Sequence, residues 1–165
     1  MSVYSQLAEQ LQYISPEFFK KRFFKKLNGL TAANVLSRQI EPELFWIKKF
    51  LKPDAVFVDI GANVGAYIYR LESHLIPKNI YAFEPNRMLY KRLRRIFPEI
   101  NLFDTALSAE DSVAEFKVPV MNGKKVHTRG TLQKNHKEAG ETSAEVQKVK
   151  VMRLDSWQAE RNLPK

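Results

Sequence analysis

The stretch VFVDIGANVG, Val56 to Gly65, constrains the fold of this chain more than any other feature of the sequence. Its apolar run is short and rich in β-branched residues, which predicts a buried strand rather than a helix. Two glycines, Gly61 and Gly65, follow the run in quick succession. Glycine permits a tight turn and lets another group approach the backbone closely. A strand that leads directly into such a turn is typical of ligand sites in α/β proteins.

The sequence around this turn repeats the alternation of strand and helix. Strands are expected at residues 55–60, 79–84 and 100–107. Apolar residues at helical spacing predict amphipathic helices over 64–75 and 89–96. The order strand-helix-strand-helix-strand, with short connections, predicts parallel strands joined by right-handed crossovers.

Helices are also expected before the first strand, at residues 3–14, 16–27 and 41–51. Ser15 and Pro16 form a start signal for the second of these, and Asn28-Gly29 forms a stop signal. This second helix carries EFFKKRFFKK, whose aromatic and basic residues suit either a membrane-surface or RNA contact, or a helix packed on the domain with a lysine-rich outer face. We favour the packed helix.

The pattern changes after residue 107. Apolar residues alternate with charged residues around 114–118 and again around 148–151, which predicts two strands of an antiparallel hairpin with one exposed face. The segment between them, 121–142, is polar and long enough to be a mobile functional loop.

Composition narrows the class of protein. The chain has 165 residues, enough for one domain with a real core, and neither a membrane-spanning stretch nor a signal peptide is recognisable, so a cytoplasmic location is expected. It lacks cysteine, and its three histidines have no metal-ligand spacing, so no metal site is predicted. The net charge of +9 favours anionic partners without choosing among them.

Asp59 and Asn63 indicate what the glycine turn binds. A dinucleotide site has glycine at the position that Asn63 occupies, because the diphosphate passes close to the backbone there. The Asn63 side chain would crowd a diphosphate, and the Asp59 carboxylate would repel it. An acid at this point suits a cationic or amine-bearing ligand. An NAD-binding domain is therefore the less favoured alternative.

Glu84 ends the second predicted strand, next to the end of the first. An acid there can accept hydrogen bonds from both ribose hydroxyls of an adenosine that lies across the strand ends. Together, the two acids suit a ligand with an amino-acid group at one end and a ribose at the other. S-adenosylmethionine fits this description and contains no phosphate.

The stretches KPDAVFVDIGANVGAYIYRL, IYAFEPNRMLYKRL and DTALSAEDSVAEFKVP resemble the FkbM-like family of S-adenosylmethionine-dependent methyltransferases. The resemblance implies a class I methyltransferase (Rossmann-like) α/β fold with strand order 3-2-1 in this part of the sheet. It implies that Asp59, Gly61, Asn63, Gly65 and Glu84 bind the cofactor, and that Asp104 and Ala106, at the end of the third strand, face adenine. It also divides the chain into a helical extension at 1–40 and a cofactor-binding domain at 41–165.

In the resembled family, further strands and helices follow the point where this sequence ends. Either the chain is a fragment or truncated form, or another chain completes the sheet. By itself it is expected to bind cofactor weakly, if at all, and to transfer no detectable methyl group. Its first strand would keep an open edge, which favours self-association. The expected methyl acceptor is the hydroxyl of a small molecule or sugar, and no catalytic residue is assigned. A non-catalytic basic module that binds RNA or an anionic surface remains the alternative from a different class.

Overall fold

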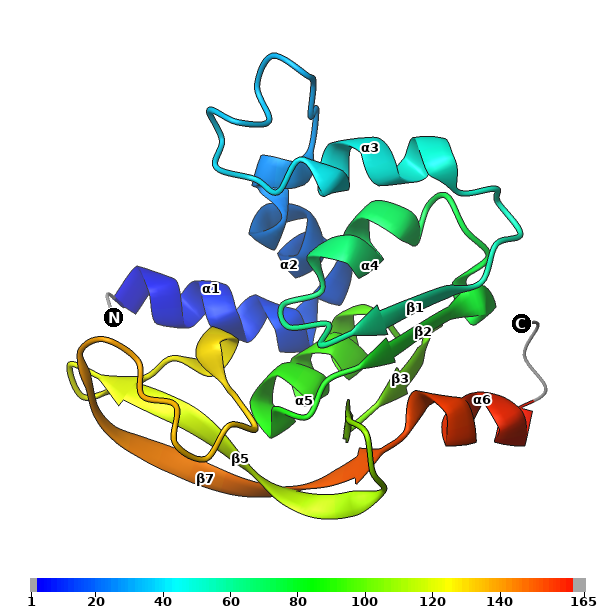
Figure 1. Ribbon diagram of the computed structural model, residues 1–165. Coiled ribbons are helices and arrows are strands. Elements are labelled where there is room, and N and C mark those ends of the chain that lie inside the picture. The colour runs from blue at the N-terminus through cyan, green and yellow to red at the C-terminus, as the bar shows by residue number, and fades with distance from the viewer. Residues whose placement is uncertain (1–2, 162–165) are drawn as a thin grey trace.

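The computed structural model describes the backbone of residues 3–161 and the side chains of residues 9–161. Its centre is a parallel sheet of three strands in the order β1-β2-β3 (Figure 1). These strands are β1 (Phe57–Ile60), β2 (Ile80–Phe83) and β3 (Asn101–Phe103). The predicted parallel arrangement and strand order are confirmed. The protein is thus a mixed α/β protein, and this sheet is compatible with a Rossmann-like fold.

Helices cover both faces of this sheet, and the alternation of side chains along β2 explains how. Ile80 and Ala82 face a core shared with α4 (Ala66–Leu71) and α5 (Arg87–Ile96). Tyr81 and Phe83 face the opposite way and pack against Trp157 of α6 (Leu154–Arg161), with ring centroids 5.2 and 5.0 Å from the indole. Because β2 is covered on both faces, side chains that point either way are apolar. The sequence of β2 is therefore a continuous apolar run.

The N-terminal helices pack on the outer side of this layer. They are α1 (Val3–Ile14), α2 (Pro16–Phe23) and α3 (Glu43–Phe50), with a 3₁₀ turn at Lys25–Leu27 after α2. Phe19 and Leu27 are buried in the same core as Leu93 of α5, whereas Phe18 is 56% exposed and Phe23 is 37% exposed. The interpretation of the second helix as packed on the domain is confirmed. The boundary at residue 40 stays a prediction, because the apolar core runs across it.

A second sheet has the order β4-β7-β5-β6. Its strands are β4 (Thr105–Leu107), β5 (Ser112–Met121), β6 (Lys124–Lys125) and β7 (Glu141–Met152). The predicted antiparallel hairpin is confirmed by the pairing of β5 with β7. The connecting segment is more ordered than a free loop, since it includes β6 and 3₁₀ turn η3 (His127–Arg129).

Two predictions about elements were wrong. The segment 100–107 is not one strand, because the chain bends at Asp104 and β4 leaves the first sheet to pair in parallel with β7. The helix predicted over 64–75 is the short α4, since Gly65 has a left-handed backbone and Val64 belongs to the turn before it. A 3₁₀ turn, η2 (Pro77–Asn79), then leads into β2.

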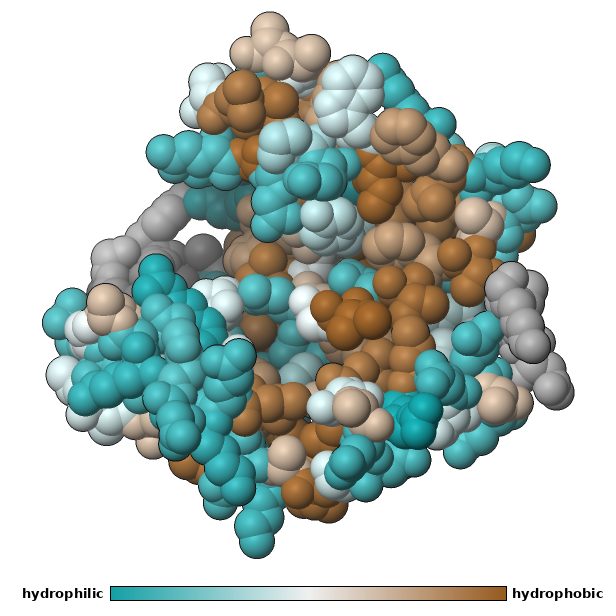
Figure 2. Space-filling view, in the orientation of Figure 1, coloured by the Kyte–Doolittle hydropathy of each residue, from teal (hydrophilic) through white to brown (hydrophobic). Residues whose placement is uncertain are grey.

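The first strand has one partner among the described residues, so its other edge is uncovered. Apolar side chains lie near this edge in Figure 2, and Ile60, the last residue of β1, is 58% exposed. In the described part of the chain, no helix has both the length and the apolar character needed to cross a bilayer.

Candidate functional site

The glycine turn between β1 and α4 is held in a conformation that few residues adopt. Gly61, Asn63 and Gly65 all have positive φ, at 78°, 52° and 87°. The backbone N–H groups of Gly61 and Ala62 both donate to the carbonyl of Phe83, at 3.0 and 2.9 Å. These bonds fasten the turn to the carboxyl end of β2, which places it beside Glu84.

The two glycines of the turn have different roles. A Cβ atom on Gly61 would meet no atom of the described residues within 4 Å, so the backbone there is open to an approaching group. A Cβ atom on Gly65 would lie 2.6 Å from Cδ2 of Leu93, which belongs to α5, and 2.8 Å from Cε2 of Phe97, which directly follows α5. Gly61 therefore leaves room beside the site, and Gly65 lets α4 and α5 pack closely.

Glu84 is the polar centre of the site. Its side chain is 4% exposed, and its carboxylate accepts the Asn63 N–H at 2.6 Å and the Asn86 N–H at 2.7 Å. Burial raises the pKa of Glu84 to about 7, although both backbone hydrogen bonds oppose this shift and the nearby Asp59 charge adds to it. One oxygen thus fixes the glycine turn and the other fixes the start of α5.

Asp59 lies on the neighbouring strand, at the position that pairs with Ala82. Its side chain is 9% exposed, and Oδ2 is buried without a hydrogen-bond partner in the described part of the chain. Burial raises the pKa of Asp59 to about 6. A buried carboxylate oxygen without a donor is costly, so this atom is suited to receive a donor from a bound ligand.

The segment after β6 lies against the same site, which the sequence did not predict. Asn63 Nδ2 donates to the Thr128 carbonyl and Asn86 Nδ2 donates to the His127 carbonyl, each at 3.3 Å. Asn86 also caps α5, since its Oδ1 accepts the N–H groups of Met88 and Leu89. Asn86 lies three residues before the predicted helix 89–96, and an asparagine near the start of an apolar helical stripe was the available signal for this cap.

The remaining two predicted site residues separate in the structure. Asp104 is exposed and directly follows β3, whose Phe103 carbonyl accepts the N–H of Glu84 at 3.0 Å. It therefore lies at the same end of the sheet as Asp59. Ala106 belongs to β4 instead of the third strand and is buried in the core of the second sheet with Phe116. The prediction that Ala106 ends the third strand was wrong, because the chain changes sheets after Asp104.

The stability of the ligand-free protein should fall as the pH rises. The pKa values of Asp59 and Glu84 are higher in the folded protein than their ordinary values of 3.8 and 4.5, so the folded state binds protons more tightly than the unfolded state. Their destabilising effect is absent below about pH 4 and complete above about pH 7, and amounts to on the order of 2 to 5 kcal/mol in total.

We therefore expect a higher melting temperature at about pH 5.5 than at about pH 8, measured by calorimetry. Asp59→Asn removes one titrating group and should reduce the difference. The contrary result is a melting temperature that rises with pH over this range, equally in the wild-type protein and in the variant. It would contradict the assignment of these two acids as the controlling groups.

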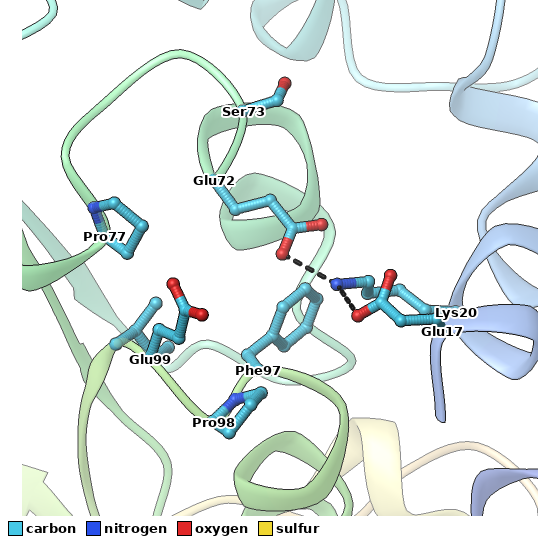
Figure 3. A pocket seen from close by; sticks show the side chains of 9 residues that line it. Glu17, Lys20, Glu72, Ser73, Pro77, Phe97, Pro98 and Glu99 are labelled. Carbon is cyan, nitrogen blue, oxygen red and sulfur yellow. Dashed lines mark hydrogen bonds and ion pairs between the residues drawn. The ribbon is translucent and has the colours of Figure 1, made fainter. Parts of the chain in front are cut away.

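A cavity of about 300 Å³, whose lining contains no residue of the glycine turn, lies beside α2 (Figure 3). Lys20 points into it, is 6% exposed, and forms ion pairs with Glu17 at 2.7 Å and with Glu72 at 2.9 Å. Burial opposes the charge, but the hydrogen bonds to the two glutamates prevail and raise the pKa of Lys20. Lys20 also lies 5.2 Å from the centre of the Phe97 ring. These contacts dock the N-terminal helices on α4 and α5.

In the described part of the chain, no three histidine, aspartate or glutamate side chains come together as metal ligands. The candidate site is thus an acidic pair, a glycine turn with left-handed backbone and a covering segment at the carboxyl ends of parallel strands.

Comparison with known proteins gives little further information. No family model matches the chain, and no solved structure matches it. One similar protein is the AMB antimetabolite synthetase AmbE of Pseudomonas aeruginosa, which is 37% identical over 62 residues. That match covers 35% of this chain and 3% of the synthetase. The chain therefore spans a small fraction of the length of this relative.

Proposed function

We propose that the protein is an S-adenosylmethionine-dependent methyltransferase that methylates a hydroxyl of a small molecule or sugar. The observation that carries the proposal is the pair of buried acids, Asp59 and Glu84, at adjacent parallel strand ends around the glycine turn. Asp59 contributes most, because its buried Oδ2 atom has no hydrogen-bond partner among the described residues. The cofactor carries an ammonium group that would supply the donors.

The residues of the turn fit the other parts of this cofactor. Gly61 leaves its backbone open, and Asp104 is exposed at the end of the neighbouring strand. Glu84 already accepts two backbone N–H groups, so ribose hydroxyls would share its remaining lone pairs. The cofactor, when bound, supplies a methyl group activated by a sulfonium. The chain's own residues would bind and orient it, and we assign no catalytic base.

The alternative of a dinucleotide is less well supported. Asn63 occupies the place of the glycine that lets a diphosphate approach, and its side chain bonds to the carbonyl of Thr128. A diphosphate would also meet the buried Asp59 carboxylate. Both features favour a ligand without phosphate at this turn.

A ligand titration of the 165-residue chain tests the proposal. We expect S-adenosylhomocysteine to bind weakly but saturably and to shift the amide NMR signals of Gly61, Asn63 and Gly65. Asp59→Asn should weaken binding about tenfold or more, because a hydrogen bond to a charged group contributes about 1.5 to 3 kcal/mol. The matched control is Asp54→Asn, which changes an exposed acid just before β1 and should leave binding unchanged.

Protein stability separates loss of the site from loss of the fold. Asp59→Asn removes a buried charge, so the melting temperature of the ligand-free variant at pH 8 should not decrease. Equal affinity in the Asp59→Asn and Asp54→Asn proteins would contradict the role of Asp59. Binding of NADH in place of S-adenosylhomocysteine would reverse the assignment in favour of a dinucleotide-binding domain.

The open edge of β1 is the surface through which we propose that copies of the chain associate. The backbone groups along this edge have no partner strand among the described residues, and exposed apolar side chains such as Ile60 lie beside it. Unpaired strand edges of this kind readily add another strand.

A further inference from the structure

A second cavity lies between the start of α5, residues 145–148 of β7, Lys125 of β6 and His127 of η3. Its volume is about 710 Å³, larger than that of the cavity at Lys20. Figure 2 shows hydrophilic side chains gathered over the hairpin region. The side chains that give the cavity its charge are Arg87, Lys91, Lys125, Lys148 and Glu145, with His127 and Gln147 between them.

The cavity has an excess of positive charge that the described side chains do not neutralise. Among the described residues that line it, Glu145 is the one acid, and this acid is already paired with Lys125. Arg87 and Lys91 are exposed one helical turn apart, and neither forms an ion pair with any carboxylate of the described residues. Two unpaired cations that share one concave surface attract an anion from solution.

Side chains rather than backbone amides would hold such an anion. The N–H of Arg87 donates to Gln147 Oε1 at 3.2 Å, and the N–H groups of Met88 and Leu89 donate to the capping Asn86. The first amides of α5 are therefore already bonded. The guanidinium of Arg87 keeps most of its donors free, since its single recorded bond is a long one of 3.5 Å to the Lys148 carbonyl. Arg87 can thus bind a phosphate or carboxylate in a bidentate way.

His127 connects this cavity with the acidic site. Its Nδ1 atom lies 3.3 Å from Asn86 Oδ1, which must be an oxygen because it accepts two helix N–H groups. Nδ1 therefore carries the proton in this contact, and Nε2 of the neutral ring remains an acceptor. Asn86 in turn donates its N–H to Glu84. Asn86 thus lies between the basic cavity and the acidic pair. It contacts His127 of the cavity on one side and Glu84 on the other.

We propose that this cavity binds the anionic group, a phosphate or carboxylate, of a hydroxylated small molecule. In the methyltransferase proposed above, that molecule is the methyl acceptor. Only this identification of the molecule, and not the anion site itself, rests on the proposed function. The arrangement separates charge along the site, with acids for a cationic cofactor on one side of Asn86 and cations for an anionic acceptor on the other. Arg87 and Lys91 hold the anion, and His127 Nε2 accepts a hydrogen bond from a neighbouring hydroxyl.

Titration with pyrophosphate, followed by calorimetry and by amide NMR shifts, tests the anion site. We expect saturable binding that shifts the amide signals of Arg87, Lys91 and Gln147. The double variant Arg87→Gln/Lys91→Gln should bind pyrophosphate at least about tenfold more weakly, since it removes two charge-assisted contacts. The control, Arg94→Gln/Lys150→Gln, loses the same charge at exposed positions outside the cavity and should bind as the wild-type protein does.

The outcomes distinguish this inference from the proposed function. An equal loss of affinity in both double variants, or an absence of saturable binding, would overturn the anion site and indicate a general effect of net charge. Single-stranded RNA could also compete with pyrophosphate for the protein. If both double variants weaken that competition equally, this result would overturn the anion site in the same way. Each variant is also titrated with S-adenosylhomocysteine. If pyrophosphate binds and S-adenosylhomocysteine does not, only the cofactor proposal fails, and if the reverse holds, only the anion site fails.

Discussion

Glu84→Ala is expected to destabilise the protein by about 2 to 5 kcal/mol, because two backbone donors lose the same acceptor. The carboxylate accepts the N–H groups of Asn63 and Asn86, and the second of these is fully buried. Each unsatisfied donor costs about 1 to 3 kcal/mol. Removal of a buried charge offsets part of this loss, but the cavity left by the side chain adds to it.

Chemical denaturation at pH 8 measures this change in the free energy of unfolding. Glu110→Ala is the matched control, since Glu110 is an exposed glutamate in the turn between β4 and β5. It should change stability by less than about 0.5 kcal/mol. The amide signals of Asn63 and Asn86 should shift in the Glu84 variant only. A Glu84→Ala protein with wild-type stability would show that the carboxylate does not hold the turn and the helix start together.

Gly65→Ala is expected to lower the free energy of unfolding by a similar amount, because the alanine would strain the backbone and overpack the contact with α5. The residue has a φ of 87°, and the added Cβ would lie 2.6 Å from Leu93 Cδ2 and 2.8 Å from Phe97 Cε2. A side chain in the left-handed region costs about 1 to 2 kcal/mol, and overpacking costs about 1 to 3 kcal/mol. We therefore expect the free energy of unfolding to fall by about 2 to 5 kcal/mol, measured by urea denaturation.

A second glycine separates the two causes. Gly123 has a φ of 70°, but a Cβ atom there would meet nothing within 4 Å. Gly123→Ala should therefore show the conformational cost alone, about 1 to 2 kcal/mol. If the two alanine variants lose the same stability, the close approach of α4 to α5 at Gly65 is not what the glycine provides.

Local sequence patterns predicted most of the elements and their order. The apolar runs before Gly61 and Glu84 formed the expected strands, and the stripe of Leu89, Leu93 and Ile96 formed the buried face of α5. Such patterns are reliable because a strand or helix buries the side chains at its own period. The short connections between these elements predicted that the strands run parallel, and the family resemblance implied the order β1-β2-β3 that the sheet has.

The errors arose where contacts with segments far along the chain decide the local structure. Nothing in the run from 100 to 107 marks the bend at Asp104, because Thr105–Leu107 is held by pairing with β7, which lies far along the chain. Ala106 was therefore placed with the third strand, whereas its surroundings belong to the second sheet. The helix predicted from residue 64 begins later, because Gly65 has a left-handed backbone and precedes the first residue of α4, where Leu93 and Phe97 leave no room for a side chain.

The sequence by itself determined the local chemistry of this protein: an acid before a glycine turn, an acid after the next strand, and the α/β alternation that sets both at strand ends. Tertiary structure alone decided the state of these groups. It buried Asp59 with no partner for Oδ2 among the described residues, gave Glu84 two backbone donors, and brought His127 across to Asn86. Burial and hydrogen bonding depend on segments that lie far apart in the chain. They set the pKa values of these groups and decide which of their atoms can still form hydrogen bonds with a ligand.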